Sequence, residues 1–212
     1  MTMTPTKQND MTVKPDFRPL RPTDDMSVVA HLLFDTDPYI YEDLFGDIKT
    51  AEEVLPFLFA RNTGVFNYQA YHVALLDGKI VGLSSLYKHN DKWDEASVRM
   101  AFAEAGKKLP PSFDAVSKYF VSVHNYTAET NACNICILPE MRRRGIGEFM
   151  LSNLIIMAGN SNITLTVLKS NTAAINLYQK HGFRVLYEFD DYGGYGRPTV
   201  KSYKMILLNS DV

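Results

Sequence analysis

The chain has 212 residues, of which 46% are hydrophobic and 22% are charged, as in an ordinary single globular domain. Its formal net charge of −2 argues against a protein that binds nucleic acid or anionic membranes through overall charge, so any electrostatic role is local. No apolar stretch reaches the roughly 18 residues of a membrane-spanning helix, and we expect neither a nucleic-acid nor a membrane partner.

The N-terminal segment, residues 1–15, is polar and is predicted to be a disordered tail ahead of a folded domain at residues 16–212. It lacks the apolar segment of a signal peptide, which favours a cytoplasmic protein. Cys133 and Cys136 lie three apart in an apolar run, where strand residues point to opposite faces and are poorly placed to form a disulfide. Two reduced, buried cysteines fit the same compartment, and no metal site is predicted because the histidines are scattered.

The first part of the chain predicts a strand, helices and a β-hairpin. Asp77-Gly78 between two apolar runs is a strong hairpin signal, and apolar residues at helical spacing mark the helices. The predicted elements are a strand at 16–21, helices at 26–34 and 51–60, an aromatic and acidic segment at 39–45, and strands at 71–76 and 79–87.

Residues 88–126 are predicted to be an insertion or long connection before the next strand. A helical pattern covers residues 95–107, two prolines end it, and residues 112–120 are helical or irregular. These helices could cover a substrate site, although most surface insertions have no catalytic role.

The last third alternates strands and helices, which together with the first part predicts a mixed α/β domain. The strands are expected at 131–138, 163–168, 184–189 and 200–208, the helices at 148–158 and 171–181, and a glycine-rich turn at 191–198.

The segment 137–147 predicts an anion-binding loop. A strand leads into a loop that contains Gly145 and Gly147, and the loop opens directly into a helix. The first N–H groups of a helix have no partner within it, and the helix dipole favours a negative charge there. Three successive arginines, 142–144, add positive charge. The loop lacks the Lys-Ser/Thr pair of a P-loop, and Met150 stands where a dinucleotide fingerprint needs its third glycine.

Two motifs resemble the GNAT N-acetyltransferase superfamily. The segment Arg142-Arg143-Arg144-Gly145-Ile146-Gly147 is similar to the family's Arg-x-x-Gly-x-Gly pyrophosphate motif. Residues 171–183 match its Asn-x-x-Ala-x-x-Leu-Tyr-x-x-x-Gly-Phe pattern at every specified position. The resemblance spans about residues 17–208. It implies one α/β domain with a central, mostly antiparallel, twisted sheet that splays between the strands at 131–138 and 163–168.

The resemblance implies acetyl-CoA, the acetylated form of coenzyme A, as the co-substrate, wedged between the parted strands. Backbone amides of the loop would bind the pyrophosphate, and the strand before the loop would pair with the pantetheine arm and face the acetyl carbonyl. The implied cofactor-binding residues are Ile135, Ile137, Arg142, Arg143, Arg144, Gly145, Ile146, Gly147, Glu148 and Asn171.

Tyr178, in the second motif, is the implied catalytic residue. In many family members this tyrosine protonates the departing thiolate, a task that suits a phenol because it is protonated at pH 7. The alternative is a core aromatic residue with a satisfied hydroxyl group. The acceptor amine would attack the thioester directly after losing a proton to a base or to water. Asn131 stands at the family's carboxylate position and cannot serve as the base. The remaining candidates, each with a structural explanation too, are Glu129, His124, His72, Glu42 and Asp43.

The predicted function is acetyl transfer to a primary amine of a small molecule or peptide, whose identity stays open. The aromatic and acidic segment 39–43 and the loop 190–197, with Tyr192 and Tyr195, are the expected walls of the acceptor site. The alternatives are a catalytically silent coenzyme A-binding regulatory module and a structural domain whose arginine loop binds another phosphate. A longer acyl donor and a homodimer, common among relatives, also stay open.

Overall fold

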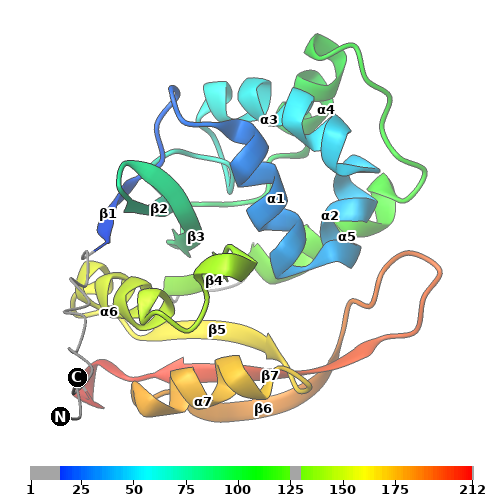
Figure 1. The fold of residues 1–212 in the computed structure, drawn as a ribbon. Helices are drawn as coiled ribbons and strands as arrows, with labels where there is room; N and C mark the ends of the chain where they lie inside the picture. Colours follow the sequence, from blue (N-terminus) through cyan, green and yellow to red (C-terminus); the bar gives the residue numbers. More distant parts are fainter. Residues whose placement is uncertain (1–14, 125–129, 212) are drawn as a thin grey trace, which may run out of the picture.

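The structure, a computed structural model, describes residues 15–124 and 130–211. The tail predicted at residues 1–15 therefore lies almost entirely outside the described residues. Figure 1 shows a strongly twisted sheet with helices on both faces. In sheet order the strands are β1 (Asp16–Pro19), β2 (Tyr71–Leu76), β3 (Lys79–Tyr87), β4 (Thr130–Ile137), β5 (Ile163–Leu168), β7 (Val200–Leu207) and β6 (Arg184–Asp191).

The helices follow the predicted order along the chain. They are α1 (Met26–Thr36), α2 (Pro38–Phe45), α3 (Ile48–Arg61), α4 (Glu95–Glu104), α5 (Phe113–His124), α6 (Ile146–Ala158) and α7 (Thr172–Lys180), with short 3₁₀ helices at Pro139–Met141 and Asn209–Asp211. Within the described residues, none of these helices has the length and apolar character needed to cross a membrane.

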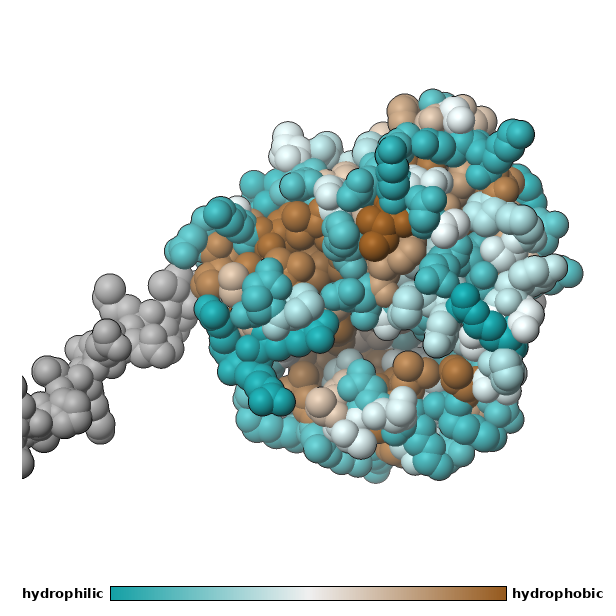
Figure 2. Space-filling view, turned by 45° about the vertical axis from the view of Figure 1, so that its right-hand side comes forward, coloured by the Kyte–Doolittle hydropathy of each residue, from teal (hydrophilic) through white to brown (hydrophobic). Residues whose placement is uncertain are grey.

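The sheet splits between β4 and β5, the two strands that run parallel. They pair only at Thr130 with Ile163 and at Asn131 with Thr164, whereas every other neighbouring pair in the sheet is antiparallel. Beyond these two residue pairs the strands diverge, and in the space-filling view a hollow separates the lower part of the molecule from the part above it (Figure 2). The predicted α/β fold with a mostly antiparallel, splayed sheet is confirmed.

Two large apolar clusters pack against the sheet. On the side of β2 and β3, the five helices α1 to α5 enclose a cluster that includes Tyr71 and Phe102. On the side of β5 and β7, helices α6 and α7 cover a second cluster that includes Leu154 and Met205. This second cluster also includes Leu86 of β3 and Ala132 of β4, so the two halves of the sheet share a core at the end where β4 and β5 still pair.

A β-bulge in β4 changes which way its side chains point. Ser85 pairs with Cys133 and Leu83 pairs with Cys136, so two residues of β4 stand opposite one of β3. Asn134 adopts the left-handed conformation (φ 54°) that asparagine tolerates better than most residues. As a result both cysteines lie on the same face of the sheet and contact the same core, and both are free. The prediction that they point to opposite faces is wrong, because it assumed a regular strand.

Caps and glycines shift several helix boundaries from the predicted ones. Helix α3 begins earlier than predicted because the Asp47 side chain accepts a hydrogen bond from the Thr50 N–H (2.7 Å). Helix α4 ends earlier than predicted, since Gly106 takes a positive φ (66°) and the Lys107 N–H closes the helix onto the Phe102 carbonyl (2.9 Å).

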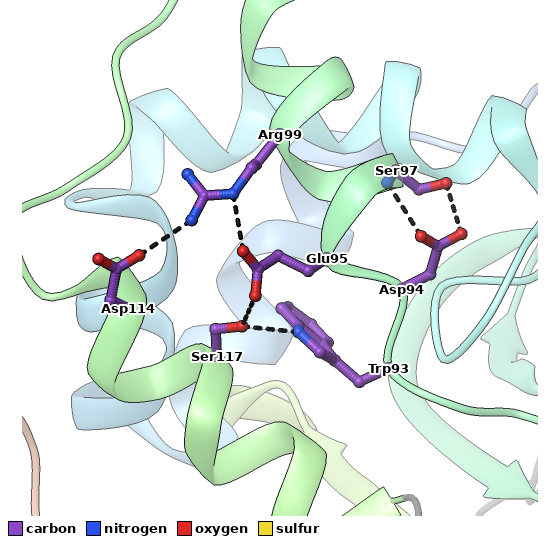
Figure 3. Close-up of polar contacts among 7 residues, drawn as sticks. All are labelled: Trp93, Asp94, Glu95, Ser97, Arg99, Asp114 and Ser117. Carbon is purple, nitrogen blue, oxygen red and sulfur yellow. Dashed lines mark hydrogen bonds and ion pairs between the residues drawn. The ribbon is translucent and has the colours of Figure 1, made fainter.

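A polar network joins α4 to α5 (Figure 3). Arg99 donates to Glu95 (2.8 Å) on its own helix and to Asp114 (2.9 Å) on α5. The Ser117 hydroxyl donates to Glu95 (2.6 Å) and accepts from the buried indole N–H of Trp93 (2.9 Å). This network fixes the position of α5 relative to α4.

Candidate active site

The anion-binding loop has the predicted geometry at the N-terminus of α6. Gly145 stands at the N-cap with a positive φ (77°) and contributes no side-chain cap, so the N–H groups of the first turn keep no intrahelical partner. Arg143 and Arg144 are exposed beside them. Arg142 donates from Nε to the Ile137 carbonyl oxygen (3.1 Å), which holds the loop against the end of β4.

Gly147 lets α6 approach β4 closely. A Cβ atom at this position would lie 3.0 Å from Cδ1 of Ile137, tighter than almost all real contacts. The next residue, Glu148, pairs with Lys180 of α7 (2.8 Å). The start of α6 is thereby packed on β4 and tied to α7, on the two sides of the split.

The remaining predicted cofactor-binding residues lie on β4 and at the start of α7. Ile135 and Ile137 are half-buried on β4, where the strand edge toward β5 has no strand partner after Asn131. Asn171 is exposed at the start of α7, and its Oδ1 accepts from the Ala174 N–H (3.2 Å), so its capping role is observed. The backbone of β4 thus offers unpaired N–H and C=O groups to a ligand in the split.

Tyr178 is buried in α7, with only 8% of its surface exposed. Its ring packs on Phe183, with ring centroids 6.0 Å apart, and its hydroxyl has no hydrogen-bond partner among the described residues. Burial raises the pKa of Tyr178 to about 12, and the nearby thiols of Cys133 and Cys136 add to this. The phenol therefore keeps its proton at neutral pH and lies close to β4.

The bulge in β4 is fixed by three buried tyrosines. Asn134 accepts from the Tyr41 hydroxyl (2.8 Å) and donates to the hydroxyls of Ser85 (3.0 Å) and Tyr87 (3.1 Å). The Tyr87 hydroxyl donates in turn to that of Tyr71 (2.8 Å). Sequence reasoning missed this network, and its only local signal is a polar asparagine within an apolar strand.

Three aspartates gather on the other side of the bulge. Asp37 caps α2, Asp43 lies in its last turn, and Asp191 ends β6. Burial raises the pKa of Asp37 to about 6, and the negative charges of Asp191 and Asp43 add to this. Burial also raises the pKa of the Tyr119 phenol. The charge of Asp191, a hydrogen bond between Tyr119 and Asp191, and the charge of Cys133 raise it further. The cluster therefore lies beside β4 and the Cys133 thiol.

The loop after β6 is bound to α2, and these two segments contain the predicted walls of the acceptor site. Asp43 accepts hydrogen bonds from the Tyr192 hydroxyl (2.6 Å) and from the backbone N–H of Tyr195. Glu42 pairs with Arg197 (2.9 Å), whose guanidinium lies over the Tyr39 ring at 4.4 Å from its centroid.

A cavity of about 600 Å³ opens where this wall meets the C-terminal end of β5. Its lining residues are Tyr39, Leu168, Lys169, Ser170, Val200 and Lys201. Tyr39 is two residues from Asp37 and Val200 pairs with Asp191, but none of the three aspartates lines the cavity.

The structure restricts the list of candidate bases. Glu42 is held in an ion pair, and Oδ2 of Asp43 already accepts two hydrogen bonds. His72 is buried and stacks on Phe17 at 5.4 Å between ring centroids, where burial lowers its pKa. Glu129 and the side chain of His124 lie outside the described residues. Asn131 is buried with an unpartnered Oδ1. Asp37 and Asp191, which sequence reasoning did not consider as bases, are two further carboxylates on this side of the site, and Asp191 Oδ1 accepts a hydrogen bond from the Tyr192 N–H (2.8 Å).

Comparisons with known proteins agree with this geometry. The model of the acetyltransferase (GNAT) family matches residues 32–183. An N-acetyltransferase from Staphylococcus aureus Mu50 is similar in structure, with a TM-score of 0.68, 19% identity, and coverage of 91% of this chain and 100% of that one. No curated protein matches the chain at a significant level.

Two further solved structures share the fold at low identity. A GNAT family acetyltransferase from Elizabethkingia anophelis, with acetyl-CoA bound, has a TM-score of 0.52 and 17% identity, and the match covers 92% of this chain and 98% of that one. The ribosomal-protein-S18-alanine N-acetyltransferase from Escherichia coli has a TM-score of 0.51 and 19% identity, with 91% and 92% covered.

Proposed function

Because the chain belongs to the acetyltransferase (GNAT) family, we propose that it transfers an acetyl group from acetyl-CoA to a primary amine. The observation that carries the proposal is the arrangement around the split sheet. An anion-binding helix start, an unpaired strand edge and the unpartnered hydroxyl of Tyr178 all adjoin β4. One ligand with a phosphate end and a thioester end would engage all three. The free cysteines suit a cytoplasmic location.

The residues present fit acetyl-CoA. Gly145 and the N–H groups that follow it form a backbone cradle with open space around the glycine, and Arg143 and Arg144 supply positive charge for a pyrophosphate. The unpaired edge of β4 can hydrogen-bond the amides of a pantetheine arm. When bound, acetyl-CoA supplies a thioester carbonyl as the electrophile.

The chain's own groups then account for the proton movements and for the charge that develops. N–H groups of the β4 edge near the bulge can stabilise a developing oxyanion, and the network around Asn134 keeps them in place. Tyr178 Oη holds its proton at neutral pH and can donate it to a departing sulfur. Asp37 and Asp191 can accept the proton that the ammonium group of the acceptor must lose.

The proposal is tested by thermal unfolding with and without acetyl-CoA. Ligand at about 100 times its dissociation constant should stabilise the protein by about 2.7 kcal/mol. Arg144→Glu reverses an exposed charge beside the helix start and should weaken binding at least tenfold, whereas Lys49→Glu, the same change on the remote helix α3, should have no effect. An amine panel would follow, with release of free coenzyme A as the readout.

Each outcome has a distinct meaning. Stabilisation of the wild type that Arg144→Glu loses would support the cofactor site. No stabilisation at millimolar acetyl-CoA would refute the proposal. Tight binding without turnover on any amine would replace it by a regulatory module that senses coenzyme A.

A further inference from the structure

Strand β6 forms an outer edge of the sheet, because β7 is its single neighbour among the described strands. It lies along the bottom of the molecule in Figure 1. Its first five residues, 184–188, are all exposed, and they include the consecutive hydrophobic residues Val185 (42%), Leu186 (53%) and Tyr187 (52%). No other part of the described chain exposes three large hydrophobic side chains in a row. An edge strand of this composition is a surface to which a second chain can bind.

A β-bulge interrupts β6 in the middle of this segment. Val185 pairs with Met205 of β7. Tyr187 pairs with the residue just before Met205, so Leu186 has no partner in β7. A bulge at an edge opposes a continuous backbone ladder with another strand. The contact that this edge can offer is therefore made by side chains and is centred on Leu186.

The two ends of the segment carry opposite charges. Arg184 begins it and Glu188 ends it, and both residues are exposed. Oε2 of Glu188 accepts a hydrogen bond from Lys169 (2.8 Å), whereas its Oε1 accepts none within the described part of the chain. The charges of residues 184–188 sum to zero, so two copies of the segment do not repel each other through net charge.

The sequence Arg-Val-Leu-Tyr-Glu is complementary to itself when two copies run antiparallel. In a two-fold arrangement, residues at equal distances on either side of the axis face each other. An axis through Leu186 brings the two Leu186 side chains together and sets each Val185 against the other copy's Tyr187. The same axis sets each Arg184 against the other copy's Glu188. A shift of the axis by half a residue or one residue sets a charged side chain against a hydrophobic one, which disfavours the other registers.

We infer that two copies of this chain associate through residues 184–188 of β6, about a two-fold axis at Leu186. Arg184 of each copy binds the remaining Oε1 of Glu188 in the other, which adds to the ion pair with Lys169. Five residues from each copy make a small contact, for which a dissociation constant of about 1–100 μM is expected. The contact uses no residue of the proposed cofactor or acceptor site, so it stands or falls independently of the proposed function.

Sedimentation equilibrium from about 5 to about 500 μM measures this association. The mass of the wild type should rise from the 24.0 kDa of one chain toward twice that value. Leu186→Asp places two carboxylates together on the axis and should weaken the association by about tenfold or more. Ile156→Asp is the matched control, because Ile156 is even more exposed (76%) but belongs to α6, and it should leave the association unchanged.

Mixing two charge-reversed variants tests the register. Arg184→Glu opposes two carboxylates at both ends of the contact, and Glu188→Arg opposes two guanidinium groups, so each variant alone should associate about tenfold more weakly than the wild type. A mixture of the two should associate about as tightly as the wild type, because both ends of the mixed dimer again pair opposite charges. Circular dichroism shows that each variant is folded.

Three results would overturn the inference. They are a wild type that is still monomeric at about 500 μM, a Leu186→Asp protein that associates like the wild type, and a mixture that associates no more tightly than its two components.

Discussion

Replacing Asp37 by asparagine is expected to stabilise the ligand-free protein at pH 8. The pKa of Asp37 is about 6 in the folded state against an ordinary 3.8. As the pH rises from about 4 to 6, the unfolded chain therefore loses this proton first, and the folded state becomes less favourable. A difference of one in pKa corresponds to about 1.4 kcal/mol, which sets an upper limit of about 3 kcal/mol. Because the side chain is partly exposed, screening by water reduces the expected gain to about 1–2 kcal/mol.

Asparagine keeps the helix cap and removes only the charge, so the gain is electrostatic. It should appear as a rise of about 3–6 °C in Tm at pH 8 and should shrink to about half at pH 5. Asp47→Asn is expected to change stability in the opposite direction, since its hydrogen bonds to Thr50 lower the pKa of Asp47. A lower Tm for Asp37→Asn at pH 8, or a gain that does not depend on pH, would refute the reasoning.

Three further changes test other parts of the molecule. Tyr178→Phe should reduce kcat by about 10²-fold with the affinity for acetyl-CoA unchanged, measured by steady-state kinetics and thermal shift; equal activity would remove the tyrosine from the mechanism. Ser117→Ala leaves the buried indole N–H of Trp93 without its acceptor and should destabilise the protein by about 1–3 kcal/mol in urea unfolding. Gly145→Ala should cost about 1 kcal/mol, because nothing crowds the position and only the positive φ opposes a side chain. An unchanged urea midpoint for Ser117→Ala would contradict the stabilising role of its hydrogen bond to Trp93. An unchanged midpoint for Gly145→Ala would contradict the expected cost of a positive φ.

Local signals made much of the fold predictable. Asp77-Gly78 predicted the β2–β3 hairpin, and both residues have the positive φ (51° and 75°) that the tightest hairpin turns require. The loop at Gly145 was equally predictable, since a strand, two glycines and an amphipathic helix are adjacent in the sequence. Helix α6 begins at Ile146, about half a turn before the predicted start at Glu148, because a glycine cap has no side chain that marks the boundary.

The cluster beside the bulge was not predictable in the same way. Asp37, Tyr119 and Asp191 belong to three elements that are far apart in the sequence, and only the folded chain brings them together. The bulge at Asn134 was also hidden, because a strand pattern does not tell where one extra residue interrupts the alternation. Both features depend on which strands and helices become neighbours, which no short window of sequence contains.

The residues on the two sides of the split sheet are distributed differently along the sequence. The residues proposed to bind the cofactor come from one continuous stretch, residues 135–178, whereas the predicted walls of the acceptor site come from two segments on either side of it, residues 39–43 and 190–197. Under the proposed function, point changes in those two segments would alter recognition of the acceptor and leave the side of the acetyl donor unchanged. The substrate could then change by single substitutions while the donor stays the same.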